Sequence, residues 1–190
     1  MIGSVRQGSR MSSPVVQFDD LRRVHDLAAN QYPHEYLDDG LGAIGLFLHD
    51  PPKNAAYRPT PTNSVTFASI GVDGIHFSSL SDSHNFNPQS PVVLTVPMEL
   101  ETPNWIVGES LHDFLCLGCE NGYAELANLA NDVDGTLMRY RNPETLWFDE
   151  RVPAILKLLT DELSLVPWRN QRARFDDLQS RLMPLLQFKG

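Results

Sequence analysis

The stretch from residue 65 to residue 115 constrains the fold of this chain more than any other part of it. Short runs rich in valine, isoleucine and phenylalanine alternate there with segments rich in glycine, asparagine, serine and proline. This pattern is typical of short strands joined by turns. Glycine stands at both ends of Gly71–Gly74, where a tight hairpin needs positive φ angles. The expected strands are Val65–Ser69, Ile75–Leu80, Pro91–Val96 and Trp105–Gly108.

A capped helix is expected directly after the last of these strands. Ser110 is a good N-cap residue, and Asp113 follows three positions later, where its carboxylate can bond back towards the first turn. Leu111, Phe114 and Leu115 then give the segment an apolar helical face. Strands that lead into a helix predict an α+β fold, with a small mixed or antiparallel sheet of about 4–6 strands packed against helices.

The flanking segments have mainly helical patterns. Helices are expected at about 17–30, at 122–131, at Pro153–Leu163 and at Gln171–Leu186, the last interrupted at Pro184. The short apolar run Ala43–Leu48 fits a strand or a buried loop, and Pro51 and Pro52 are expected to end it.

Three further segments are expected to be short or irregular. Residues 53–63 should form an extended connection, because prolines and threonines disfavour helix there. A turn is expected at Asn131–Gly135, and Pro143 is expected to open a short helical turn through Trp147. Residues 1–14 are predicted to be a flexible lead-in, and residues 15–190 a single domain with C-terminal helices.

Length and composition narrow the class of protein. A chain of 190 residues can bury a core without disulfides or metal. No apolar run approaches the ~18 residues that a membrane helix needs, and the N-terminus has basic residues without the apolar core of a secretory signal. We therefore expect a cytoplasmic protein that does not bind membranes.

The acidic residues are concentrated in the middle of the chain. Between Arg58 and Arg139 there is no lysine or arginine in 80 residues, which contain ten acids. The net charge of the chain is −9. The electrostatic field of so many unbalanced carboxylates repels nucleic acid and steers a basic protein partner towards the chain. The alternative is a solvated acidic surface that only keeps the protein soluble.

Two groups of residues are candidates for metal, redox or ligand chemistry. His112, Cys116 and Cys119 have spacing that places three potential ligands near one face of a helix. A structural zinc usually has four ligands, so buried reduced thiols are favoured and no metal or cofactor is expected. His76 near Asp73 can be part of a ligand pocket or a hydrogen-bonded structural histidine. No catalytic motif accompanies it, so the chain is not expected to be an enzyme.

The arginines and tryptophans also allow two interpretations each. Arg169, Arg172 and Arg174 lie beside Trp168 and fit a weak nucleic-acid footprint or, better, a solvated helix face. Trp105 and Trp147 fit core positions. An exposed tryptophan in the acidic region would instead be a contact for a protein partner.

Several motifs resemble the SUKH superfamily, which contains fungal cell-wall-synthesis regulators and bacterial immunity proteins. They are TPTNSVTFASIGVDGIHFSSL, SPVVLTVPME, NWIVGESLHDFLCLG and GYAELANL, within about residues 41–130. The resemblance implies an antiparallel sheet backed by helices and no catalysis. Bacterial members neutralise secreted toxins, often nucleases, by binding them.

These inferences lead to one leading hypothesis and two alternatives. The chain is expected to be a non-catalytic protein-binding module, most specifically an immunity protein against a basic nuclease-type toxin domain. One alternative is a regulatory or scaffold domain that binds a host protein. The other is a small-molecule-binding protein centred on His76 and Asp73. The candidate partner-binding residues are Asp82, Glu99, Glu101, Trp105 and Glu109, with Asp82, Glu99 and Glu101 ranked first as loop acids.

Overall fold

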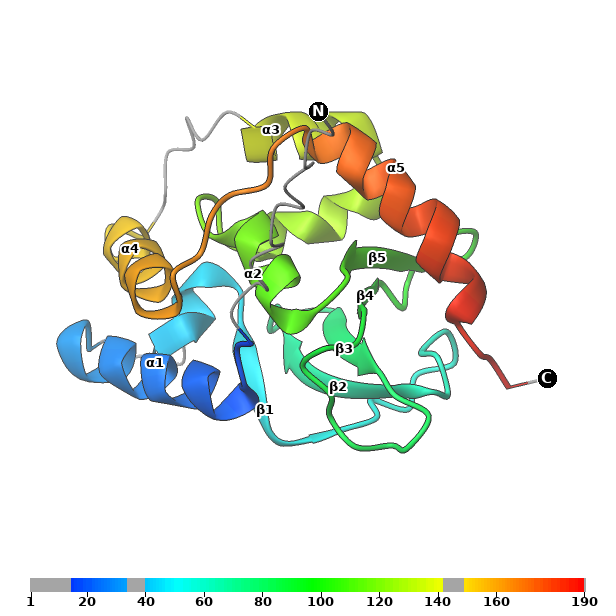
Figure 1. Ribbon diagram of the computed structural model, residues 1–190, viewed down its shortest axis with the longest axis horizontal. Coiled ribbons are helices and arrows are strands. Elements are labelled where there is room, and N and C mark those ends of the chain that lie inside the picture. Colours follow the sequence, from blue (N-terminus) through cyan, green and yellow to red (C-terminus); the bar gives the residue numbers. More distant parts are fainter. Residues whose placement is uncertain (1–14, 34–39, 142–148, 190) are drawn as a thin grey trace, which may run out of the picture.

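Five strands form one antiparallel sheet in which each strand pairs with the next along the chain (Figure 1). The computed structural model describes residues 15–33, 40–141 and 149–189. The strands are β1 (Phe47–Lys53), β2 (Ser64–Ser69), β3 (His76–Leu80), β4 (Val92–Thr95) and β5 (Asn104–Gly108). This architecture confirms the predicted α+β class. Because consecutive strands alternate in direction, the β2–β3 and β4–β5 turns lie at one end of the sheet and the β3–β4 loop at the other.

The predicted central strands and their hairpin are present. Gly71 and Gly74 adopt φ angles of 86° and 68°, the positive values for which glycine is suited. The prediction that Pro51 and Pro52 end the preceding apolar run is wrong, because β1 continues through both. β1 is an edge strand, and its register with β2 shifts between Leu48 and Lys53. Prolines are tolerated there because an edge strand does not need every N–H for pairing.

Helices pack on the sheet and beside it. The α-helices are α1 (Phe18–Gln31), α2 (Leu111–Gly118), α3 (Val133–Arg141), α4 (Val152–Leu163) and α5 (Gln171–Leu182), and the 3₁₀ helices are η1 (Gly40–Ile44), η2 (Ala124–Ala130) and η3 (Met183–Leu185). The turn expected at Asn131–Gly135 is shorter than predicted, because α3 already begins at Val133. The Gly135 N–H donates to Asp132 Oδ1 at 2.8 Å, so Asp132 caps a helix that contains a glycine. The predicted lead-in at 1–14 and the segment from Pro143 to Trp147 lie outside the described residues.

Aromatic side chains join α2 to the sheet. The Phe114 ring of α2 lies 4.8 Å from Phe77 of β3 and 4.9 Å from Tyr123, measured between centroids. Ser110 caps α2 as predicted, accepting the Asp113 N–H at 3.2 Å. Helices α1 and α4 pack on each other and on η1, to the left of the sheet in Figure 1. None of the helices in the described ranges has both the length and the apolar character needed to cross a bilayer.

One face of the sheet is polar and nevertheless buried. His76, Thr95 and Asn104 are directly opposite one another on β3, β4 and β5 and are at most 5% exposed. Residues 54–63, which we call the crossing segment, lie over this face. Pro59 accepts a hydrogen bond there from Asn104 Nδ2 at 3.0 Å. The Thr62 N–H in turn donates to the Gln187 carbonyl at 2.7 Å. The crossing segment and the C-terminal tail therefore satisfy polar groups that would be costly to bury alone.

Helix α5 covers the outer edge of β5 with a side-chain amide. The Ile106 N–H donates to Gln179 Oε1 at 3.0 Å, and Gln179 Nε2 donates to the Ile106 carbonyl at 2.7 Å. Gln179 thus pairs with the strand as a neighbouring backbone amide would. Capping of this kind protects an edge strand from pairing with other chains.

Candidate functional site

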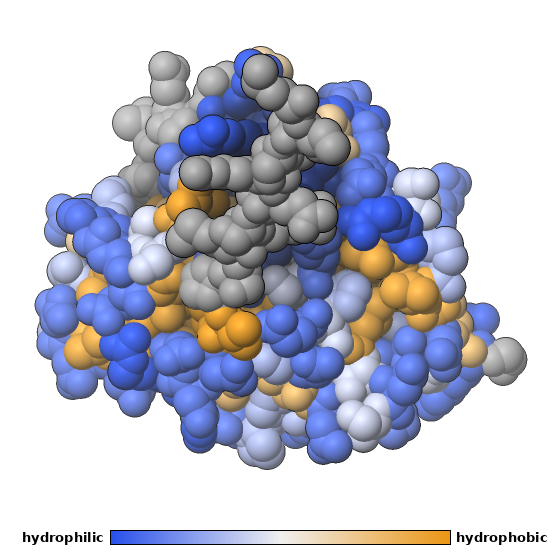
Figure 2. All heavy atoms as spheres, viewed as in Figure 1, coloured by the Kyte–Doolittle hydropathy of each residue, from blue (hydrophilic) through white to orange (hydrophobic). Residues whose placement is uncertain are grey.

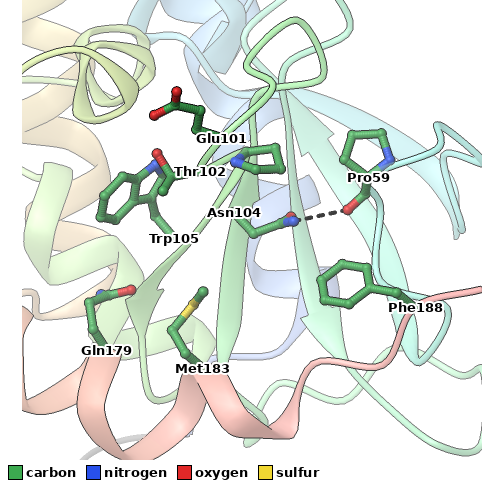
Figure 3. A pocket seen from close by; sticks show the side chains of 9 residues that line it. Pro59, Glu101, Thr102, Asn104, Trp105, Gln179, Met183 and Phe188 are labelled. Atoms are coloured by element: carbon green, nitrogen blue, oxygen red, sulfur yellow. Dashed lines mark hydrogen bonds between the residues drawn. The ribbon is translucent and has the colours of Figure 1, made fainter.

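A largely apolar groove lies at the beginning of β5, just beyond the point that Gln179 covers (Figure 3). Its volume is about 460 Å³. The β4–β5 turn, α5, the crossing segment and the C-terminal tail all contribute to its wall. We call it the edge groove, and its main lining residues are Pro59, Glu101, Trp105, Gln179, Met183 and Phe188. In Figure 3 these side chains surround Asn104. Figure 2 shows hydrophobic residues gathered over the C-terminal end of α5.

Trp105 forms one wall of the edge groove. Its ring stacks on Phe175 of α5 with centroids 5.8 Å apart, and the side chain is only partly buried. The indole Nε1 is itself buried and has no hydrogen-bond partner among the described residues. Buried indole N–H groups usually have an acceptor, so this donor is suited to a ligand that brings one.

The β4–β5 turn places acidic and apolar side chains next to the groove. Glu101 is exposed and lines the groove, whereas Glu99 is half-buried and accepts the Glu101 N–H at 3.0 Å. Glu99 therefore also holds the turn in shape. Met98 and Leu100 are 78% and 92% exposed, which leaves two large apolar side chains in water. We call residues 98–101 the acidic turn.

Arginines of α5 pair with some of the acids in the central stretch that contains no lysine or arginine of its own. Arg174 lies 2.6 Å from Asp113 and 3.3 Å from Glu109, and Arg181 lies 3.2 Å from Glu109. Arg172 pairs with Asp134 in the same way. Glu109, a predicted partner-binding residue, is thus already paired within the chain. The same contacts occupy two of the three arginines that were considered for nucleic acid, and Arg174 also lies 5.1 Å from the Trp168 ring centroid.

The acids of the acidic turn differ from this group. Glu99, Glu101 and Asp73 form no ion pair within the described part of the chain, and all three belong to turns at one end of the sheet. Asp82 belongs to the β3–β4 loop at the opposite end, where it accepts a weak hydrogen bond from Gln187 Nε2 at 3.5 Å. The structure therefore brings Glu99, Glu101 and Trp105 together and separates them from Asp82.

His76 has the contacts of a structural histidine. Its Nδ1 lies 2.7 Å from the Gly74 carbonyl, which only accepts, so Nδ1 carries the proton and donates. Nε2 then accepts from the Thr60 hydroxyl at 3.1 Å. A hollow of about 300 Å³ borders both His76 and Asp73, but the histidine is 1% exposed and Asp73 faces solvent. This arrangement offers a ligand little of the imidazole.

We expect the buried His76 to make folding stability depend on pH. Burial lowers the pKa of His76 below its ordinary value of 6.5. The unfolded chain then binds a proton more readily, so this contribution is complete above pH 6.5 and is lost as the pH falls below it. Acidification from pH ~7.5 to ~5.5 should lower the free energy of unfolding by about 1 kcal/mol. Denaturant unfolding at both pH values checks this, and H76Q should have a smaller pH slope. An equal slope in H76Q would contradict the assignment.

The structure does not arrange Cys116, Cys119 and His112 as a group of three metal ligands. Cys116 Sγ lies 3.8 Å from His112 Nδ1, whereas Cys119 Sγ donates to the Cys116 carbonyl at 3.4 Å. Across the three described ranges no three His, Cys, Asp or Glu side chains are grouped to hold a metal ion. Burial raises the pKa of both thiols, that of Cys119 to about 12, so neither has thiolate character near neutral pH.

No protein-family model, curated protein or solved structure matches this chain. The resemblance to the SUKH superfamily therefore stays a prediction from the motifs. Trp147, the second predicted core tryptophan, lies outside the described residues.

Proposed function

We propose that this chain is a non-catalytic protein-binding module whose partner docks on the edge groove and the acidic turn. The observation that carries the proposal is the acidic turn itself, which holds Met98 and Leu100 in water beside the unpaired Glu101. Exposed apolar side chains next to a groove with a partly buried tryptophan are typical of interaction sites. An unpaired carboxylate at the rim favours a basic partner and speeds its association.

More specifically, we propose that the partner is a basic toxin domain and that the chain acts as its immunity protein. Two features support this: the unpaired acids at one end of the sheet and the motif resemblance. A regulatory domain that binds a host protein would use the same surface. Gene neighbourhood discriminates between them, because an immunity gene lies directly beside the gene of its toxin.

Binding to the product of the neighbouring gene tests the proposal. With that protein in a catalytically inactive form, we expect L100S and E101Q each to weaken binding about tenfold, or ~1.4 kcal/mol. E101Q should act mainly on the association rate and reduce its dependence on salt. Titration calorimetry and stopped-flow kinetics measure both.

E120Q is the matched control, because Glu120 is an exposed acid away from the groove. Its affinity should equal that of the wild type. If the neighbouring protein binds L100S and E101Q with unchanged affinity, its binding site is not the edge groove and the acidic turn. If it does not bind at all, the immunity proposal is overturned.

A further inference from the structure

The backbone of β5 has an unpaired position inside the edge groove. The Val96 N–H donates to the Pro103 carbonyl at 2.8 Å, so Thr95 and Asn104 form a non-hydrogen-bonded pair. In such a pair each residue directs its N–H and C=O away from the other strand. The backbone N–H and C=O of Asn104 therefore point away from β4, as those of Ile106 do two residues later. No hydrogen bond joins them to another residue in the described part of the chain.

Helix α5 pairs with one of these two positions and leaves the other open. Gln179 bonds both backbone groups of Ile106. One helical turn further along, Met183 lies at the groove beside Asn104, and a thioether cannot replace an amide as donor and strong acceptor. The edge of the sheet is thus paired at Ile106, whereas at Asn104 it borders the groove without a hydrogen-bond partner.

We propose that the occupant of the edge groove is an extended basic segment of a partner protein that adds to β5 as a strand. This inference rests on the proposed function and names the kind of segment that is recognised. One residue of the segment exchanges both backbone hydrogen bonds with Asn104. The side chain of that residue projects to the same face as Asn104, towards Pro59 and Phe188, and both of its neighbours project to the opposite face, towards Trp105.

Charge decides between a basic segment and a second copy of this chain. Antiparallel pairing of two β5 edges through Asn104 would place the two acidic turns at opposite ends of the new strand pair. The β5 edge of a second copy offers Glu101 no cation, because residues 59–138 contain no lysine or arginine. A lysine or arginine next to the paired residue instead meets Glu101, and a side-chain or backbone acceptor can take the buried Trp105 indole N–H.

The test uses a synthetic peptide, acetyl-Lys-Val-Lys-Val-Lys-Val-Lys-amide, with the isotopically labelled protein. We expect the peptide to shift the NMR signals of the Asn104 amide and the Trp105 indole and to slow hydrogen exchange at Asn104. The Ile106 amide, already bonded to Gln179, should change little. The peptide with every backbone nitrogen methylated should bind at least tenfold more weakly, because it lacks N–H donors. A peptide with glutamate in place of lysine should also bind at least tenfold more weakly.

Two variants at Met183 of the protein provide a matched pair for the same test. M183Q places an amide beside Asn104 as Gln179 does beside Ile106, so it should weaken peptide binding at least tenfold. M183L keeps the apolar wall, so its affinity for the peptide should stay within about twofold of the wild-type value. Equal binding by M183Q and M183L, or by the methylated and unmethylated peptides, overturns strand addition. If strand addition is overturned while L100S and E101Q still weaken binding of the natural partner, the proposed function stands without strand addition. If the peptide protects the Asn104 amide but the natural partner binds L100S and E101Q with wild-type affinity, the proposed function fails instead.

Discussion

D113A should lower the free energy of unfolding by about 3 kcal/mol, the largest loss we expect from a single polar side chain here. Asp113 Oδ2 accepts the Glu109 N–H at 2.9 Å, and Oδ1 accepts from Trp168 Nε1 at 3.0 Å and from Arg174 at 2.6 Å. The carboxylate is only 14% exposed, so its removal takes these hydrogen bonds from a poorly solvated site and leaves Arg174 with only its longer contact to Glu109. We place the loss at the low end for buried pairs because Arg174 is 31% exposed.

Urea unfolding and thermal melts measure this effect, and Tm should fall by roughly 6–12 °C. D113N keeps an acceptor for Trp168 and should lose only about 1 kcal/mol. D176A, at an exposed acid of α5 that pairs with Arg172, is the surface control and should change stability by less than ~0.5 kcal/mol. A D113A protein as stable as D176A would show that Asp113 does not hold α2 to α5.

Q179L should destabilise the protein by about 2 kcal/mol and make it self-associate. Leucine preserves the volume of the side chain but removes both hydrogen bonds to Ile106, a residue that is fully buried. The edge of β5 would then lack hydrogen-bond partners at Ile106 as well as at Asn104, and longer unpaired edges recruit other strands. Urea unfolding measures the first effect, and sedimentation velocity at several concentrations measures the second.

S180A is the matched control for Q179L, because Ser180 is the next residue of α5 and faces solvent. It should remain monomeric to the same degree as the wild type and change stability by less than ~0.5 kcal/mol. If Q179L keeps wild-type stability and sedimentation, the amide does not cap the edge in solution.

The central sheet was predictable because its signals are local. The glycines of the β2–β3 turn and the Ser110 cap each act within a few residues, and both are present. β1 was harder to predict, because whether Pro51 and Pro52 interrupt a strand depends on whether it lies at an edge. The beginning of α3 was missed for a related reason: Gly135 disfavours a helix, and the Asp132 cap offsets that only once the helix exists.

The candidate site was only half predictable. Glu101 and Trp105 lie in one local segment, and their residue types indicate a recognition surface. Gln179, Met183 and Phe188 complete the groove from about 74 to 87 positions away, and no local pattern pairs them with β5. The charge of the acidic stretch was also misleading in part, because composition counts Glu109 and Asp113 as free acids. The distribution of arginines on α5 is the one signal that hinted at their pairing.

The distance in sequence between α5 and its partners bears on how the protein is made. Arg174 follows Asp113 by 61 residues, and Gln179 follows Ile106 by 73. At a synthesis rate of roughly 5–20 residues per second, several seconds pass before the ribosome supplies them. During that interval the nascent sheet has an unprotected border and an uncompensated carboxylate. Chaperones that shield such borders should therefore matter most for this polypeptide while its final third is still being translated.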